Sequence, residues 1–171
     1  MSDTKRTSYD SSSLSRLQAQ AGAEMRECVV GALIANQKGA IFAQKRADDR
    51  KAFPGCWDIA GGHVEAGETL YDALAREIQE ETGWELVQLA DIVKVFDWEL
   101  VKDGKVVKKR EFDFLVDVSG DMNAPEIEVE KFTEFRWVGL ADIEILKENR
   151  AEGDTVIYDL VKQALEMIHQ K

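Results

Sequence analysis

The segment GGHVEAGETLYDALAREIQEETGW, which begins at Gly61, constrains the fold more than any other part of this chain. Its glycine pair ends the preceding apolar run, and an amphipathic helix follows. Leu70, Leu74 and Ile78 recur every four residues and predict an apolar stripe that packs on a sheet. Gly83 suits the left-handed residue that commonly ends a helix. The segment therefore predicts a loop, a helix and a second loop.

Three acidic residues, Glu77, Glu80 and Glu81, lie in the last turns of this predicted helix. At about 100° per residue they fall beside the apolar stripe, at the rim where the helix meets the sheet. Their like charges repel, and the negative end of the helix dipole disfavours them further. A divalent cation such as Mg²⁺, which prefers oxygen ligands, would offset both costs. The alternative interpretation is an acidic face in contact with solvent.

Composition and charge limit the classes of protein to consider. Apolar residues make up 44% of the 171 residues and charged residues 32%, as in globular proteins. No apolar run is long enough to span a bilayer, and the N-terminus lacks a secretory signal, so we expect a cytoplasmic protein without a membrane partner. The net charge of −11 argues against binding a nucleic acid polymer. A small phosphorylated substrate is compatible with this charge if divalent cations bridge the acidic protein and the substrate phosphates.

The chain reads as a polar, serine-rich tail followed by one α/β domain. We expect residues 1–23 to form a flexible tail with a short helical segment, and residues 24–171 to form the domain. Strands are predicted at 26–36 and 40–46, joined as a hairpin, at 55–59, on both sides of the turn at 102–105, and at 132–140. Helical periodicity returns at 140–148 and 154–170. This order favours a mixed sheet sandwiched between helices.

The spacing within the opening segment resembles the box of the Nudix hydrolase family. That box is a glycine, five residues, a glutamate, seven residues, Arg-Glu, an apolar residue, any residue, Glu-Glu, any residue, a glycine and an apolar residue. Every fixed position is present, at Gly62, Glu68, Arg76, Glu77, Glu80, Glu81 and Gly83. Two residues, one at the last position of the box and one just before the box, depart from the usual pattern. Trp84 stands where an aliphatic residue is common, and Ala60 stands where a proline is common.

The resemblance implies the family's α/β/α sandwich with a mixed sheet and a loop-helix-loop catalytic box. It also implies roles for individual residues. Glu77, Glu80 and Glu81 would be catalytic and would bind Mg²⁺ or Mn²⁺, and the carbonyl of Gly61 would be a further metal ligand. Structural roles fall to Arg76, which would hold the box carboxylates, to Glu68, which would hold the loop to the helix, and to Gly62 and Gly83.

Two further expectations concern residues outside the box. The family often takes one more metal ligand from elsewhere, and the candidates here are Glu126, Glu128, Glu130 and Glu134. The sequence does not rank these four. Arg46, at the end of the second predicted strand, is a candidate for contact with a substrate phosphate.

The resemblance implies a Mg²⁺-dependent hydrolase that cleaves the diphosphate linkage of a nucleoside diphosphate joined to another group, such as a nucleotide. One alternative is chemistry like that of isopentenyl diphosphate isomerase, which needs a catalytic cysteine in a polar setting. Cys28 lies in an apolar strand and Cys56 beside Trp57, and neither matches. A second alternative is a nucleotide-sensing module without catalysis, but such modules usually lose box acids. The resemblance also allows a homodimer.

Overall fold

A computed structural model describes residues 9–170 of the chain. The elements in chain order are α1 (Ser11–Ala23), β1 (Glu27–Ile34), β2 (Ile41–Arg46), β3 (Trp57–Asp58), β4 (Ala60–His63), α2 (Leu70–Thr82), β5 (Glu85–Lys102), β6 (Lys105–Ser119), β7 (Phe132–Val138), the 3₁₀ helix η1 (Ile143–Lys147) and α3 (Val156–His169). None of these helices combines the length and the apolar character that a membrane span requires.

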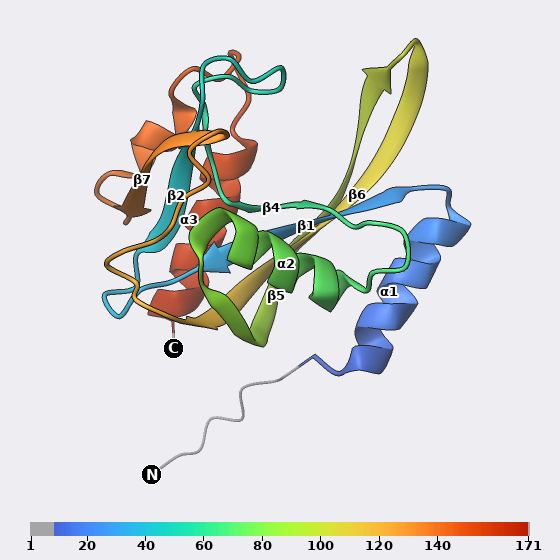
Figure 1. Cartoon of the computed structure of the whole chain (residues 1–171), viewed down its shortest axis with the longest axis horizontal. Helices are drawn as coiled ribbons and strands as arrows, with labels where there is room; N and C mark the ends of the chain where they lie inside the picture. Colours follow the sequence, from blue (N-terminus) through green and yellow to red (C-terminus); the bar gives the residue numbers. More distant parts are fainter. Residues whose placement is uncertain (1–8, 171) are drawn as a thin grey trace.

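The strands form two sheets. The larger sheet has the order β4-β1-β6-β5, and the smaller has the order β3-β2-β7. Strand β1 pairs antiparallel with β4 and parallel with β6, so the larger sheet is mixed. Helices α1 and α2 lie on one side of it, and α3 lies behind it (Figure 1). The expected sandwich of helices around a mixed sheet is confirmed.

Two apolar clusters fill the spaces between these layers. One lies under α1 and α2 and includes Leu74, Ile78, Phe112 and Phe114. The other lies under α3 and η1 and includes Leu33, Leu115, Leu160 and Leu165. Successive residues of a strand point to opposite faces, so β6 supplies Phe112 and Phe114 to one cluster and Leu115 to the other. Trp84, buried at the last position of the box, stacks on Trp137 with ring centroids 5.8 Å apart.

The longest strands, β5 and β6, form an antiparallel hairpin that reaches beyond the rest of the sheet (Figure 1). Its turn is Asp103-Gly104, with φ of 51° and 74°. Positive φ at both central residues is the backbone that a tight two-residue hairpin needs, and Asp-Gly adopts it readily. The turn predicted at 102–105 is confirmed.

The hairpin predicted for residues 26–46 is wrong. Only a single bridge joins Ala35 to Ile41, and β1 and β2 then enter different sheets. Six consecutive residues of β1 and the first four of β2 are buried. Because both strands are covered on their two faces, their sequences lack the alternation that would have shown which neighbours they pair with.

The N-terminal region contains the helical segment that was expected there, and this segment packs on the domain. Residues 11–23 form helix α1, with Leu14 and Ala21 buried against the domain. Asp10 caps the helix by accepting a hydrogen bond from the Ser13 amide at 2.7 Å. Gln18 joins α1 to the box, because its Nε2 donates to the carbonyl of Glu68 at 2.8 Å. The part of the tail expectation that concerns residues 1–8 lies outside the described residues.

Candidate active site

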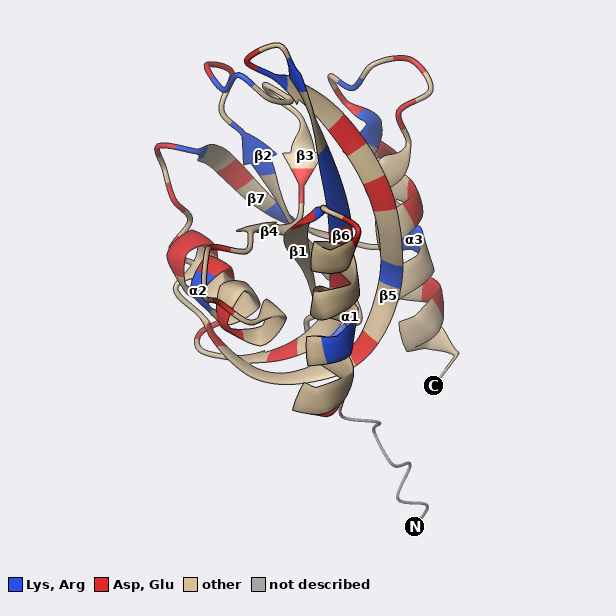
Figure 2. Ribbon diagram, turned by 90° about the vertical axis from the view of Figure 1, so that its right-hand side faces the viewer, with Lys and Arg blue, Asp and Glu red and all other residues tan. Residues whose placement is uncertain are grey.

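Helix α2 is fixed at both ends by its own sequence. At its start, the hydroxyl of Thr69 accepts a hydrogen bond from the Asp72 amide, and the Asp72 carboxylate accepts one from the Thr69 amide. This capping box gives hydrogen-bond partners to two backbone amides that have none within the helix. At its end, Gly83 takes the left-handed conformation with φ of 73°. The helix therefore presents its last two turns, which carry the acids, to the glycine-rich strand β4. Figure 2 shows the acidic residues of α2 in red.

The guanidinium of Arg76 organises the acidic end of the helix. Its Nε and Nη2 donate to the two carboxylate oxygens of Glu68 at 2.7 and 3.0 Å. Its Nη1 donates to Glu77 at 2.8 Å and to Glu80 at 3.4 Å. Nη2 also donates to the carbonyl of His63 at 3.0 Å. The Arg76 bonds lower the pKa of Glu68 to about 2. The planar fork thus joins the loop before the helix to the carboxylates on it.

Glu81 is 4% exposed and lies between the helix and both sheets. Its Oε2 accepts hydrogen bonds from the Gly61 amide at 3.0 Å and from Nε2 of Gln44 at 2.9 Å. Burial raises its pKa to about 8, and the nearby Glu77 adds to this, while the bond from Gly61 opposes it. The site therefore holds this carboxyl in one orientation at a substantial electrostatic cost.

Glu77 is also buried, at 8% exposure, and its carboxylate lies against Gly62. A Cβ added to Gly62 would lie 2.3 Å from Oε1 of Glu77, so a larger residue here would displace the Glu77 carboxylate. Burial raises the pKa of Glu77, while the bond from Arg76 lowers it. Glu80 differs from the other two, because its side chain is 48% exposed. The predicted acids are thus two buried carboxyls and one that faces solvent.

The donor set fits a hard divalent cation in its chemistry. Glu77 and Glu81 place two carboxyls in a poorly solvated position, where a nearby cation favours their charged forms. Among the described residues, no three His, Cys, Asp or Glu side chains stand close enough to enclose a metal ion by themselves. Mg²⁺ does not need such a cage, because it usually keeps several waters and takes oxygens from its substrate.

The loop before β7 brings one acid and one base to this end of α2. Glu128 pairs with Lys131 at 3.0 Å. Burial opposes the charge of Lys131, but the bond to Glu128 and the carboxyls of Glu81 and Glu77 raise its pKa overall. Of the other candidate glutamates, Glu126, Glu130 and Glu134 are exposed. The Glu126 amide donates to the carbonyl of Thr82 at 2.8 Å, which fastens the loop to the helix.

Arg46, the candidate for phosphate contact, makes its described contacts within the protein. Its Nε donates to the carbonyl of Ala52 at 2.9 Å, and its Nη1 lies 3.5 Å from Asp58. It thus fastens the loop between β2 and β3. Trp57, on β3, is fully buried, and its Nε1 donates to Glu148 at 3.1 Å.

Two residues of the site were missed by sequence reasoning, Gln44 and Lys131. Gln44 had a readable signal, because it lies two residues after the core residue Phe42 and so on the same face of β2. A glutamine on a buried face needs a polar partner, and this one is Glu81. Lys131 had no comparable signal, since its position depends on how the whole loop before β7 folds.

Comparisons with known proteins give relatives of this chain in sequence and in fold. The family model of the NUDIX domain matches residues 25–161. Nucleoside triphosphatase NudI of Escherichia fergusonii is 32% identical over 126 residues, which are 70% of this chain and 86% of that protein. NudI of Escherichia coli is 32% identical with the same coverage.

Solved structures show the same fold. The MutT protein from Methanosarcina mazei Go1 superposes with a TM-score of 0.61 at 24% identity, over 85% of this chain and 96% of that one. The MutT NUDIX hydrolase from Burkholderia pseudomallei superposes with a TM-score of 0.60 at 24% identity, over 81% and 97% of the two chains.

Proposed function

Because this chain belongs to the NUDIX family and is a Nudix pyrophosphohydrolase, we propose that it hydrolyses a phosphate anhydride bond of a nucleotide with the help of Mg²⁺. The two NudI proteins similar to this chain are named nucleoside triphosphatases, which supports nucleoside triphosphates as the first substrates to test. A nucleoside diphosphate joined to another group is the wider class. We propose residues 24–171 as the catalytic domain, with helix α1 packed against it.

One observation carries the proposal. Two buried carboxyls, those of Glu77 and Glu81, lie side by side at the glycine-rich strand β4, and the surrounding protein holds each in place. A fold rarely keeps such a pair unless it serves a ligand or a reaction. We assign the Mg²⁺ ligands to Glu77, Glu80 and Glu81, with the carbonyl of Gly61. Mn²⁺ suits the same oxygen donors.

Each part of the site has a task in this proposal. Bound Mg²⁺ would neutralise the phosphate charge and lower the pKa of a water molecule. Arg76 fixes the direction of Glu77 through its bond at 2.8 Å and anchors itself on Glu68. Gln44 and the Gly61 amide fix Oε2 of Glu81. One of the box glutamates, or Glu128, takes the proton of the attacking water. Lys131 offers a positive charge to the phosphates beside these carboxyls.

No observation favours the isomerase alternative. The thiol of Cys56 is buried and lies 3.3 Å from the carbonyl of Asn149, and Cys28 is half-buried on β1. Burial raises the pKa of both thiols, which lowers the fraction present as reactive thiolate.

A nucleotide panel tests the proposal. Purified protein with Mg²⁺ should release phosphate or pyrophosphate from at least one nucleoside triphosphate, dinucleotide or nucleotide sugar, and EDTA should stop the release. Glu81→Gln should lose activity by about a hundredfold or more. Glu99→Gln, an equal change of charge on an exposed position of β5, should keep it. Equal activity of the wild type and Glu81→Gln would reject the assignment of the site.

A further inference from the structure

We propose that Glu111, supported by Asp113 and Trp98, reads the hydrogen-bonding edge of the nucleobase and so sets the base specificity of this enzyme. The inference rests on the proposed function, because it requires a nucleotide substrate. It concerns a group of residues on the open part of the larger sheet, away from the box glutamates.

Strand register places these residues in rows that cross the larger sheet from β4, on the face opposite the one that packs against α2. Gly61 of β4 pairs with Gly31 of β1, which pairs with Asp113 of β6. In the next row, His63 pairs with Val29, and Val29 with Glu111. Paired residues share a face of the sheet, so Glu111 and Asp113 point to the same side as Gly61. Two strand spacings separate β4 from β6, which is about 10 Å.

Asp113 is the most unusual polar residue of this face. It is fully buried, and its carboxyl shares a side-chain hydrogen bond with the carboxyl of Glu111. The carboxyl lies over Gly31, where an added Cβ would be 2.1 Å from Oδ1. The chain therefore leaves room for this acid instead of filling the space with an apolar residue. A buried carboxyl whose polar neighbour is a second carboxyl is costly to desolvate, so its retention requires an explanation.

Glu111 stands beside Asp113 on the same face and is half-buried, so a ligand can reach it. Nε1 of Trp98 donates to its Oε2 at 2.9 Å and fixes the carboxyl against an aromatic ring. Burial and the neighbouring carboxyls raise the pKa of both acids. The Glu111–Asp113 pair is thus a fixed set of acceptor oxygens that can also carry a proton.

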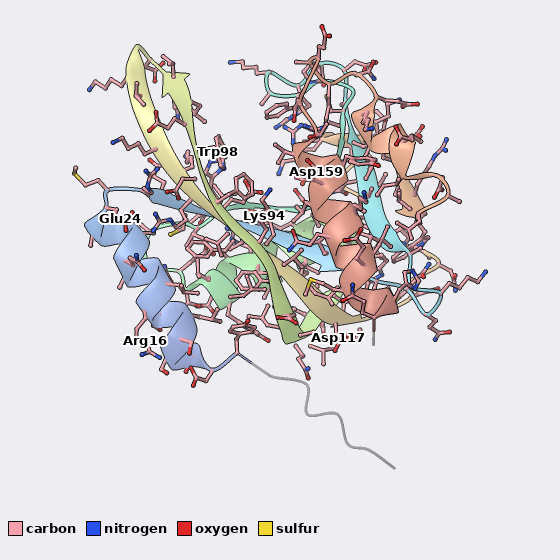
Figure 3. All side chains as sticks on the ribbon, turned by 180° about the vertical axis from the view of Figure 1, so that it is seen from behind. Arg16, Glu24, Lys94, Trp98, Asp117 and Asp159 are labelled. Carbon is pink, nitrogen blue, oxygen red and sulfur yellow. The ribbon has the colours of Figure 1, made fainter. Side chains whose placement is uncertain are left out.

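The surroundings of this pair suit a flat ring. Phe96 lies opposite Glu111 on β5, and Trp98 lies in the next row on the same face. Both rings are half-buried. Lys94 extends over the ring of Phe96, 5.1 Å from its centroid. Figure 3 shows Lys94 and Trp98 along β5. Aromatic faces beside a fixed carboxyl are what a base with N–H donors requires, because the rings stack and the carboxyl accepts the N–H bonds.

The test compares substrates that differ at a single position of the base. CTP carries an amino group where UTP carries a carbonyl oxygen. Glu111→Gln replaces an acceptor oxygen by an NH₂ donor, which disfavours the amino group and favours the carbonyl. The ratio of kcat/KM for CTP over UTP should therefore fall by about tenfold or more in the variant. The assay is run at about pH 8.5, because the pKa of Glu111 is raised to about 7 and the group is then ionised.

Two further variants separate base reading from a structural role. Trp98→Phe keeps an aromatic ring at this position but removes the N–H donor to Glu111. It should lower the ratio of kcat/KM for CTP over UTP by a smaller factor than Glu111→Gln does. Glu99→Gln, which lies on the exposed face of the same hairpin, should leave the ratio unchanged. Thermal melting checks that each variant is folded.

The outcomes distinguish this inference from the proposed function. If the wild type hydrolyses nucleotides and Glu111→Gln changes kcat/KM equally for CTP and UTP, Glu111 has a structural role and the inference is wrong. A ratio of kcat/KM for CTP over UTP that increases in Glu111→Gln overturns the inference as well. A wild type that hydrolyses no nucleotide overturns the proposed function and this inference together.

Discussion

Gln44 and Glu81 are joined across the two sheets of the molecule by a hydrogen bond of 2.9 Å between Nε2 of the glutamine and Oε2 of the glutamate. Gln44 lies on β2 of the smaller sheet, and Glu81 lies on the helix that packs on the larger one. Both side chains are buried. This bond ties the orientation of a box carboxyl to the packing between the sheets, and the site therefore depends on residues far from the box in sequence.

Replacing Gln44 should impair catalysis more than folding. Gln44→Leu removes one of two donors to Oε2 of Glu81, and it also removes an unpartnered buried amide oxygen. We expect kcat/KM to fall by about 10- to 100-fold, as for other residues that orient a ligand. The melting temperature should change little.

Gln163→Leu is the matched control for this variant. Gln163 lies on α3, away from the box, and its Nε2 donates to the carbonyl of Val93 at 2.7 Å. Its replacement should leave kcat/KM unchanged. Equal losses of activity in the two variants would contradict a specific role for Gln44.

Arg76→Lys should lower both stability and activity although it conserves the charge. A lysine cannot make the paired bonds to Glu68 together with the bond to Glu77, because it lacks the planar fork. We expect a lower melting temperature and a loss in kcat/KM of about tenfold or more. Denaturation and steady-state assays measure the two effects. A variant with wild-type values in both would show that the fork is dispensable.

Stability should fall as the pH rises from about 5 to 8, in part because of Glu111 and Asp113. Burial raises the pKa of Glu111 to about 7 and raises that of Asp113, with Asp58 adding to both shifts and Lys94 opposing them. The folded state therefore holds more protons than the unfolded state between the two sets of pKa values. Its stability is greatest below the unfolded pKa and is lost as the pH passes the folded pKa.

The double variant Glu111→Gln/Asp113→Asn isolates this contribution, since the other titrating groups are common to both proteins. Urea unfolding at several pH values should show a flatter profile for the variant than for the wild type. Parallel profiles would mean that the two acids titrate alike in the folded and unfolded states.

Gly31→Ala should destabilise the protein by about 1–3 kcal/mol, as overpacking does in other cores. The new Cβ would lie 2.1 Å from Oδ1 of Asp113 and 2.7 Å from Cδ1 of Ile59. Gly22→Ala in helix α1 is the control, because nothing lies within 4 Å of its added Cβ. Urea unfolding should show a loss for the first and none for the second. Equal stabilities would contradict the close approach of Asp113 to β1.

Local sequence predicted those parts of the structure that local chemistry determines. The box helix ends at Gly83, and the hairpin turns at Asp103-Gly104, because helix ends and turns are encoded in a few adjacent residues. The apolar stripe of α2 was readable for the same reason. The resemblance to the family box implied that Arg76 pairs with box carboxylates, and the guanidinium bonds to Glu68 and Glu77 in the structure.

Long-range pairing was beyond the reach of the sequence. The separation of β1 from β2 depends on which strands each meets, and both are buried too evenly to reveal it. Gln44 reaches Glu81 because the fold brings β2 next to the last turn of α2, 37 residues away in sequence. Glu111 and Asp113 looked like ordinary strand acids, and their shared face with Gly61 follows from two ladders that link distant segments.

The central claim is that the carboxyls of the box bind a divalent cation. Direct binding of Mn²⁺, followed by the loss of the electron paramagnetic resonance signal of the free ion, tests it without any assumption about the substrate. We expect the wild type and Glu99→Gln to bind Mn²⁺ alike, and Glu81→Gln and Glu77→Gln to bind it at least about tenfold more weakly. Equal affinity in all four proteins would contradict the account.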